Sequence, residues 1–245
     1  MPTYRTPEPL LRRAIESVLA QDIPLRLVVV NDGGLPSTVY NDRRVTVVDL
    51  PANRGRFFCD AAVLEACGTE WFAVHDADDW SEPHRYGRLI DTATSGATVA
   101  PHVEHGRTTT VRHPKQTRRD RQFRHIAHWG TGVYRTDRLR DAGGIHPGFR
   151  VGYDTLLLLM LTLTGPVAAH RQPTYHYDRR NSTSLTRAPA TGKRSGLRAD
   201  TAARLRSLYQ DAWQADDPGT VVRDDIPASL RAEVSDAADL IRERM

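Results

Sequence analysis

The 245-residue chain contains only two cysteines, Cys59 and Cys67, and it has no long apolar run. Two cysteines eight residues apart in a segment with helical spacing predict small buried side chains, rather than a disulfide framework or a metal knuckle. The longest apolar run, Leu156 to Leu163, is far shorter than the roughly 18 residues of a membrane span. The N-terminus also lacks a basic-then-apolar signal pattern. We therefore expect a cytoplasmic protein with no membrane span.

Lysine is also scarce, and the chain contains only Lys115 and Lys193. The net charge is nevertheless +4. Nearly all of the positive charge is arginine, whose planar fork binds phosphate. Such a balance suits nucleic acid, an anionic surface or a nucleotide, and composition does not choose among them. Residues 107–128 are strongly basic, but Phe123 is their only Phe, Tyr or Trp, so nucleic-acid binding is disfavoured. We interpret them as a loop that contacts an anionic or polyhydroxylated partner or is merely solvated.

The spacing of apolar residues in the first eighty positions changes between helical and strand-like. It predicts helices over Glu8–Gln21 and Phe57–Cys67, and strands over Leu25–Val30, Val45–Leu50 and Trp71–Val74. This alternation favours an α/β fold with a Rossmann-like, mainly parallel central sheet flanked by helices.

The rest of the chain predicts shorter elements and a helical end. The expected strands are Thr98–Val103, Gly130–Arg135, Val167–Ala169 and Pro173–Tyr177, and the expected helices are His84–Thr94, Thr136–Ala142, Leu156–Leu163, Leu197–Trp213 and Ala228–Arg244. Asp178–Gly196 is predicted to be a loop, and Asp216–Asp225 a turn-rich connection. We expect a catalytic domain over 1–196, with halves 1–103 and 104–196, and a C-terminal helical extension over 197–245.

Three carboxylates lie within four positions in the stretch His75-Asp76-Ala77-Asp78-Asp79-Trp80, directly after a predicted strand. Carboxylates this close resist joint ionisation unless a cation offsets them. Mg²⁺ and Mn²⁺ take oxygen ligands of this kind and usually share them with phosphates. The alternative is a polar turn that caps a helix near Glu82.

A second polar loop, Asn31-Asp32-Gly33-Gly34, also follows a predicted strand. In open α/β sheets, ligands gather beyond the carboxyl ends of the strands. Two polar loops at such ends therefore favour a ligand site over two unrelated turns.

The order of these motifs resembles the nucleotide-sugar glycosyltransferases of the GT-A fold, most closely the inverting group called family 2. The resemblance runs from about Pro2 to about Thr186. The patches that carry it are Pro2-Thr3-Tyr4-Arg5, Val28 to Gly34, Asn53 through Gly68 to Asp79, and Gly143-Gly144 followed by Asp154.

The resemblance implies a role for each matching residue. Pro2, Thr3, Tyr4 and Asp32 are expected to contact the nucleobase and ribose, since a Tyr can stack on a base and an Asp can accept its imide N–H. Asp76 and Asp78 are expected to hold a Mn²⁺ or Mg²⁺ ion and the ribose, and Asp79 to face the donor sugar. Asp154 is expected to be the general base, the alternative being an N-cap for the following helix.

Two departures from the family pattern affect the diphosphate side. The usual Ala-Arg-Asn is Cys59-Asp60-Ala61 here, so Arg54 or Arg56 is expected to replace the phosphate-facing arginine. The usual Glu-Asp before the last helix of the domain is Tyr153-Asp154. His176 is a further candidate metal ligand, the alternative being a structural histidine.

Three other expectations come from the same resemblance. The chain begins at Met1, where relatives have an apolar strand, so either most of the first strand is missing or the true start lies upstream. Arg179, Arg180 and residues 182–184 are expected to fold over the diphosphate. Trp80 and Trp129 line the acceptor side or pack in the core.

The sequence thus predicts a metal-dependent, inverting glycosyltransferase that moves a sugar from a nucleotide-diphosphate sugar to a hydroxyl of a small-molecule or glycan acceptor. The alternatives are a nucleotidyltransferase and a catalytically inactive nucleotide-sugar binding module. A nucleotidyltransferase normally has a Gly-rich basic loop near its first strand, and Tyr4-Arg5-Thr6-Pro7 is not one. The donor sugar, the acceptor and the oligomeric state stay open.

Overall fold

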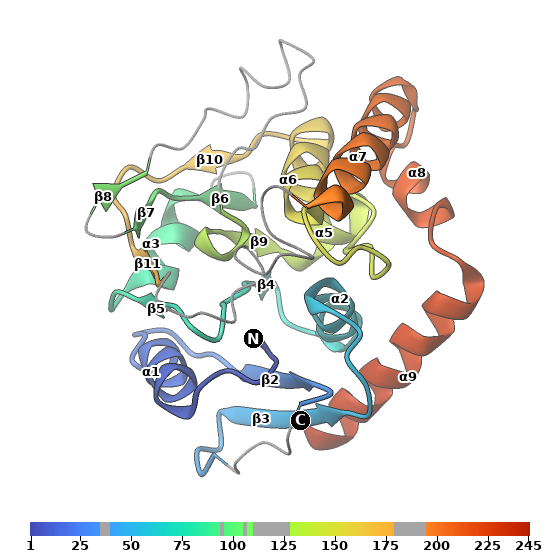
Figure 1. The fold of residues 1–245 in the computed structure, drawn as a ribbon. Coiled ribbons are helices and arrows are strands. Elements are labelled where there is room, and N and C mark those ends of the chain that lie inside the picture. Colours follow the sequence, from blue (N-terminus) through green and yellow to red (C-terminus); the bar gives the residue numbers. More distant parts are fainter. Residues whose placement is uncertain (35–39, 94–95, 105–106, 110–127, 179–194) are drawn as a thin grey trace.

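The first sheet of the protein consists of parallel strands in the order β1 (Pro2–Thr3), β2 (Leu27–Asp32) and β3 (Val45–Leu50). The computed structural model describes residues 1–34, 40–93, 96–104, 107–109, 128–178 and 195–245. Every residue of β2 is buried, as expected of a β-branched strand covered on both faces. This sheet and the helices around it confirm the predicted α/β class (Figure 1).

Helices α1 (Glu8–Leu19) and α2 (Arg56–Ala66) follow the predicted apolar spacing. On α1, the side chains of Ala14, Ile15 and Val18 are buried, which is the stripe that a 3.6-residue period predicts. On α2, the first residue, Arg56, follows Gly55, whose φ of +94° lies in the region that favours glycine.

Two further sheets lie beyond the first and contain antiparallel as well as parallel pairs. The second sheet has the strand order β10 (Ala168–Ala169), β6 (Ala97–Val99), β9 (Val133–Arg135), β4 (Trp71–Phe72). The third has the order β5 (Trp80–Ser81), β11 (Tyr175–Tyr177), β7 (His102–Glu104), β8 (Arg107–Thr108). Among them, β6 pairs with β10 and β7 with β11 in parallel, whereas β4, β5, β8 and β9 each pair in antiparallel.

Two predicted strands were wrong in more than the position of their ends. The predicted strand Thr98–Val103 is two strands, β6 and β7, in different sheets, because Pro101 between them has no N–H to donate to a ladder. The first part of the predicted strand Gly130–Arg135 is instead a 3-10 turn, η1 (Trp129–Thr131). The Thr131 hydroxyl donates to the His128 carbonyl over 2.6 Å, a local bond that competes with strand pairing.

The remaining helices are α3 (Arg85–Thr92), α5 (Thr136–Asp141), α6 (Tyr153–Thr164), α7 (Gly196–Gln214), α8 (Pro218–Asp224) and α9 (Ala228–Arg244). Helix α8 lies where a turn-rich connection was predicted. Asp217 caps this helix through the Gly219 N–H at 3.0 Å, and Pro218 occupies its first turn.

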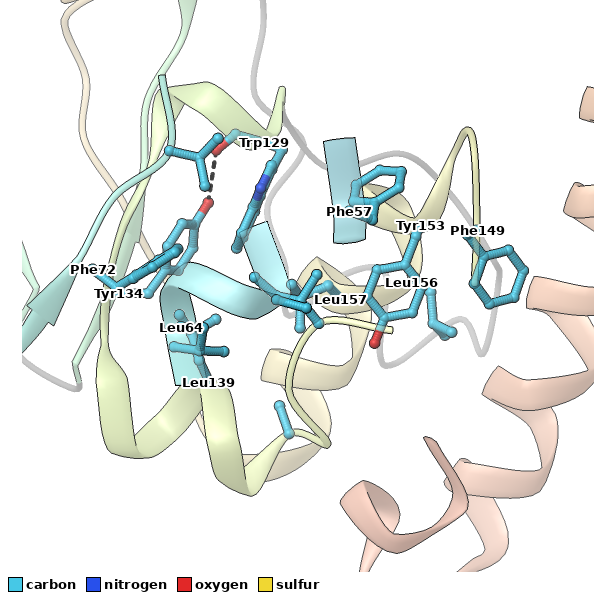
Figure 2. Close-up of a cluster of buried hydrophobic side chains, with 14 of the residues drawn as sticks. Phe57, Leu64, Phe72, Trp129, Tyr134, Leu139, Phe149, Tyr153, Leu156 and Leu157 are labelled. Atoms are coloured by element: carbon cyan, nitrogen blue, oxygen red, sulfur yellow. Dashed lines mark hydrogen bonds between the residues drawn. The ribbon is translucent and has the colours of Figure 1, made fainter. Parts of the chain in front are cut away.

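The main hydrophobic core surrounds α6, whose residues from Leu156 to Leu161 are at most 1% exposed. Figure 2 shows Phe57 from α2, Tyr153 and Leu157 from α6, and Trp129 in this core. Trp129 is 1% exposed and stacks on Tyr134 at 4.5 Å, so it packs in the core and does not line an acceptor site.

The C-terminal helices share this core. Leu205 on α7, Val222 on α8 and Ile241 on α9 belong to the same cluster of buried side chains as α6. Helix α9 also packs on α2 and β3 (Figure 1). The predicted boundary at residue 197 stays a prediction, but α7 to α9 cover part of the main core.

Both cysteines are free thiols, Cys59 buried and Cys67 half-buried. Within the described part of the chain, every helix is too short or too polar to cross a lipid bilayer.

Candidate active site

Asp76 lies in the connection between β4 and β5, where its carboxylate meets two basic side chains. Arg56 Nη1 is 2.7 Å from Asp76 Oδ1, and His128 Nε2 is 3.5 Å from Oδ2. Burial by itself raises the pKa of Asp76, but the charges of Arg56 and His128 outweigh it and lower this pKa. Asp76 is therefore ionised at neutral pH.

Asp79 is fully buried and is held by the neighbouring strand β11. Its Oδ2 accepts a hydrogen bond from the Tyr175 hydroxyl at 2.6 Å, and its Oδ1 accepts one from the Asp178 N–H at 2.7 Å. The pKa of Asp79 is raised well above its usual value. Burial is the largest cause, and the nearby charges of Asp76 and Asp78 add to it. The Tyr175 hydroxyl also accepts the Asp76 N–H at 3.3 Å, so this one phenol holds both ends of the acidic loop.

Asp78 is half-buried, and its backbone is fixed to α1. Its carbonyl accepts a hydrogen bond from Arg13 at 2.9 Å, and the same nitrogen of Arg13 pairs with Asp178 at 2.9 Å. The three predicted aspartates are thus brought together in one loop that α1, α2 and β11 hold in place.

Arg56 is one of the basic groups that face this loop. Besides Asp76, its Nη2 lies 3.6 Å from Asp60 Oδ2, beyond hydrogen-bond distance. Burial lowers the pKa of Arg56, but Asp76, Asp60 and Asp154 raise it by more, so the guanidinium stays charged. Burial also raises the pKa of Asp60. Of the two arginines that the sequence offered for the phosphate side, Arg56 faces the acidic loop.

Arg54, the other candidate, points elsewhere. It pairs with Glu233 on α9, and its guanidinium lies 4.9 Å from the centre of the Phe58 ring. Its role in the structure is to fix α9 to the loop before α2.

Asp32, at the end of β2, uses both carboxylate oxygens within the protein. They accept the N–H groups of Arg54 at 2.6 Å and Gly55 at 2.8 Å, and the side chain is 3% exposed. This carboxylate therefore fixes the start of α2. The sequence pattern did not suggest this role, since the two segments are more than twenty residues apart. A nucleobase contact of Asp32 stays a prediction.

The predicted first loop lies beside Asp32, because β1 pairs with β2 in register Thr3 to Asn31. Tyr4 is 42% exposed, with the Arg5 guanidinium 5.1 Å from its ring centre. Pro2 is half-buried, and the Thr3 hydroxyl donates to Thr6 at 3.0 Å. An exposed aromatic ring at this edge is suited to stacking.

Asp154 is half-buried in the first turn of α6, where it contributes to the raised pKa of Arg56. The N-cap of α6 is Gly152, with φ of +78° and no side-chain cap bond, so the alternative of Asp154 as N-cap is wrong. Its neighbour Tyr153 is fully buried and donates to the Gly144 carbonyl at 3.0 Å.

His176 lies on the opposite face of its strand from Tyr175, because side chains alternate along β11. Its Nε2 is 2.6 Å from Glu82 Oε1, and its ring stacks on Trp80 at 3.6 Å. The structure therefore does not bring His176 to the acidic loop. Within the described ranges, no three His, Cys, Asp or Glu side chains form a cluster able to hold a metal ion.

Three site residues were not singled out from the sequence: Tyr175, His128 and Arg13. Tyr175 and Tyr177 alternate with His176, and that period-2 pattern was the available signal for a side chain facing the loop. His128 and Arg13 reach the loop only through tertiary packing. Most of the predicted basic loop, and the predicted lid residues Arg179, Arg180 and 182–184, lie outside the described residues.

Comparison with known proteins bears on the family and the fold of the chain. The family described as glycosyl transferase family 2 matches residues 1–153, a region that ends one residue before Asp154. The succinoglycan biosynthesis protein ExoO of Rhizobium meliloti (strain 1021) is 38% identical over 95 residues, which are 36% of this chain and 27% of ExoO. The chain thus spans only part of that relative's length.

Two solved structures share the fold. TarS of S. aureus in complex with UDP superposes with a TM-score of 0.63 at 17% identity, covering 91% of this chain and 68% of that one. The mannosyltransferase PcManGT of Pyrobaculum calidifontis, in complex with GDP-Man and Mn²⁺, superposes with a TM-score of 0.56 at 16% identity, covering 98% of this chain and 83% of that one. At such identities the likeness concerns the fold alone, and it confirms the predicted GT-A architecture.

Proposed function

The chain belongs to glycosyl transferase family 2, and from this premise we propose that it transfers a sugar, with inversion, from a nucleotide-diphosphate sugar to an acceptor hydroxyl. In this proposal Asp154 accepts the proton of the attacking hydroxyl. Arg56 stabilises the negative charge that develops on the departing diphosphate.

The observation that carries the proposal is the environment of Arg56. Its Nε and Nη2 are buried and make no hydrogen bond with any described residue, while Nη1 is held by Asp76. Arg56 is half-buried, and a guanidinium with two buried donors left over is suited to an anionic ligand, since unmet donors are costly to bury. The carboxylate of Asp154, on the neighbouring helix α6, is close enough to influence Arg56.

We propose that the acidic loop, together with the diphosphate, binds one hard divalent cation, Mn²⁺ or Mg²⁺. Asp76 and Asp78 would hold it, and the diphosphate would complete its ligands, as is usual where proteins supply only one or two carboxylates. When bound, such an ion neutralises charge on the leaving diphosphate. PcManGT, which shares the fold, is known in complex with Mn²⁺. His176 as a ligand stays a prediction, which requires it to leave Glu82.

The donor end of the proposed site is the edge formed by β1 and β2. Tyr4 is the group we propose to stack on the base, with Pro2, Thr3 and Asp32 beside it. Asp79 faces the sugar in this proposal. We propose a small-molecule or glycan acceptor and a cytoplasmic location, as expected from the sequence.

A thermal-shift screen of UDP-, GDP- and dTDP-sugars, with and without Mn²⁺, tests donor binding. We expect at least one nucleotide sugar to raise the melting temperature, and more strongly with Mn²⁺. If no donor stabilises the protein under any metal condition, the donor site is absent. The variant Arg56→Ala should lose most of this stabilisation, whereas Arg242→Ala, which removes an exposed arginine that contacts Asp239 and Glu65 at the surface, should not.

The variant Asp154→Asn separates an enzyme from an inactive binding module. We expect it to bind the donor as the wild type does and to lower nucleoside diphosphate release at least about 100-fold, the size of effect typical of a general base. A wild-type protein that binds donors without turnover is a binding module. Release of pyrophosphate or formation of a new nucleotide sugar indicates a nucleotidyltransferase instead.

A further inference from the structure

Arg150 contacts the loop at the start of α2 from the segment that leads into α6. Its Nη1 donates to Asn53 Oδ1 at 2.7 Å, and its Nη2 donates to the Asn53 carbonyl at 3.1 Å. A Cβ at Gly55 would lie 3.0 Å from Arg150 Cδ, so the arginine lies directly over this glycine. Arg150 thus binds one short stretch of chain through both its backbone and a side chain.

A second contact joins the same two segments. The ring of Tyr153 meets Phe57 edge-on at 5.7 Å and stacks on Phe149 at 5.4 Å (Figure 2). Phe57 directly follows Arg56, and Tyr153 directly precedes Asp154. The rings of Phe57 and Tyr153 pack against each other. The proposed diphosphate ligand and the proposed base are therefore each next in sequence to one of these two rings.

The two contacts differ in what holds them. The Phe57–Tyr153 contact is buried in the core, whereas Arg150 and Asn53 are exposed. An exposed pair adds little to the free energy of unfolding. Its effect on the relative position of two segments can nevertheless be large, because a displacement of about 1 Å at a reacting group costs about 100-fold in rate.

We propose that Arg150 is a positioning residue, which fixes the segment Phe149–Asp154 against the loop Asn53–Arg56 and so sets the distance between Asp154 and Arg56. The inference rests on the proposed function. Arg150 touches neither donor nor acceptor in this proposal, and it acts through Asn53 on one side and through the backbone leading to Asp154 on the other.

The chain offers a matched control at the opposite end of the same helix. Arg140 donates to the backbone carbonyls of Leu64 at 3.1 Å and Cys67 at 2.9 Å, where α2 ends. Arg140 is exposed, like Arg150, and it also ties a later segment to α2. Replacing it removes a similar contact without disturbing the start of the helix.

The test compares Arg150→Ala, Arg150→Lys and Arg140→Ala in the release of nucleoside diphosphate from GDP-mannose and UDP-glucose with Mn²⁺ and water as acceptor. We expect Arg150→Ala to lower kcat about 10- to 100-fold while the donor KM changes less than about threefold. Arg150→Lys, which keeps the charge but not the bidentate contact with Asn53, should lower kcat nearly as much. Arg140→Ala should keep the wild-type kcat, and both alanine variants should have similar melting temperatures.

Asn53→Ala completes a double-mutant cycle. If Arg150 acts through Asn53, the double variant should lose no more kcat than Arg150→Ala alone. Additive losses, a wild-type kcat in Arg150→Ala, or an equal loss in Arg140→Ala would each overturn the proposal. A wild-type protein that binds donors but releases no diphosphate overturns the proposed function, and the role of Arg150 with it, so the two failures are distinguishable.

Discussion

At the scale of single residues, the proposed site depends on buried polar groups that hold one another in place. Tyr175 makes several of these contacts: its hydroxyl donates to Asp79 and accepts from the Asp76 backbone, and its ring lies 4.8 Å from the guanidinium of the fully buried Arg85. The nitrogens of Arg85 in turn donate to Ser81 Oγ and to the Gly130 carbonyl. The acidic loop thus has a fixed geometry before any ligand arrives.

Tyr175→Phe should therefore cost more stability than the removal of an ordinary buried tyrosine hydroxyl. It leaves the buried Asp79 carboxylate with the Asp178 N–H and without its phenol partner, and we expect a loss of about 2 kcal/mol in the free energy of unfolding measured with urea. The matched control is Tyr134→Phe, which removes a hydrogen bond of 3.3 Å from a fully buried tyrosine to a neutral carbonyl and should cost about 1 kcal/mol. Equal losses in the two variants would contradict this account of Tyr175.

At the scale of helices and strands, the sequence predicted the elements that the local spacing of apolar residues determines. The apolar spacing of α1 and the Leu-rich run of α6 gave those helices, and Val45–Leu50 is a strand as predicted. Pairing between distant segments escaped prediction, because no local pattern specifies it. The break at Pro101 into two sheets is one case, and the use of Asp32 to hold the start of α2 is another. The acidic loop was predictable, since its charges are adjacent in sequence, whereas its partners Tyr175 and His128 depend on the fold.

The start of α2 provides the next prediction, at Gly55. Its positive φ and the overlying Arg150 are both unfavourable to a side chain, so Gly55→Ala should lower the free energy of unfolding by about 2 kcal/mol. Gly144 also has a positive φ, +73°, but a Cβ there would meet nothing within 4 Å. Gly144→Ala should thus cost only about 1 kcal/mol of backbone strain. Urea unfolding of both variants measures the difference, and if Gly144→Ala costs as much as Gly55→Ala, crowding by Arg150 has no effect.

At the scale of the whole molecule, the C-terminal helices are joined to the proposed site by charge as well as by the core. His146, in the loop that leads to α6, is 1% exposed, and its Nε2 lies 3.0 Å from Asp225 at the end of α8. Arg204 on α7 pairs with the same carboxylate at 2.6 Å. The Gly148 N–H donates to His146 Nδ1 at 3.0 Å, so in the neutral ring the proton lies on Nε2, facing Asp225. This cluster links α7 and α8 to the segment that carries Asp154.

This buried histidine should make a contribution to stability that is lost in mild acid, whereas the raised pKa values of Asp79 and Asp60 act in the opposite sense. Burial lowers the pKa of His146, and Arg204 acts in the same direction, while Asp225 opposes them without cancelling the shift. The ring in the unfolded chain binds a proton near pH 6.5, whereas the native ring binds it only at a lower pH, so this contribution to stability is present above pH 6.5 and declines as the pH falls below it. Buried His75, whose pKa is lowered to about 3, acts in the same sense as His146 and lowers the free energy of unfolding by roughly 1 kcal/mol at pH 5.5.

Urea unfolding at pH 7.5 and 5.5 tests the role of His146. The free energy of unfolding should decline less between these pH values in His146→Gln than in the wild type, with the part due to His75 remaining. An unchanged decline in this variant would mean that His146 is protonated as readily in the native protein as in the unfolded chain.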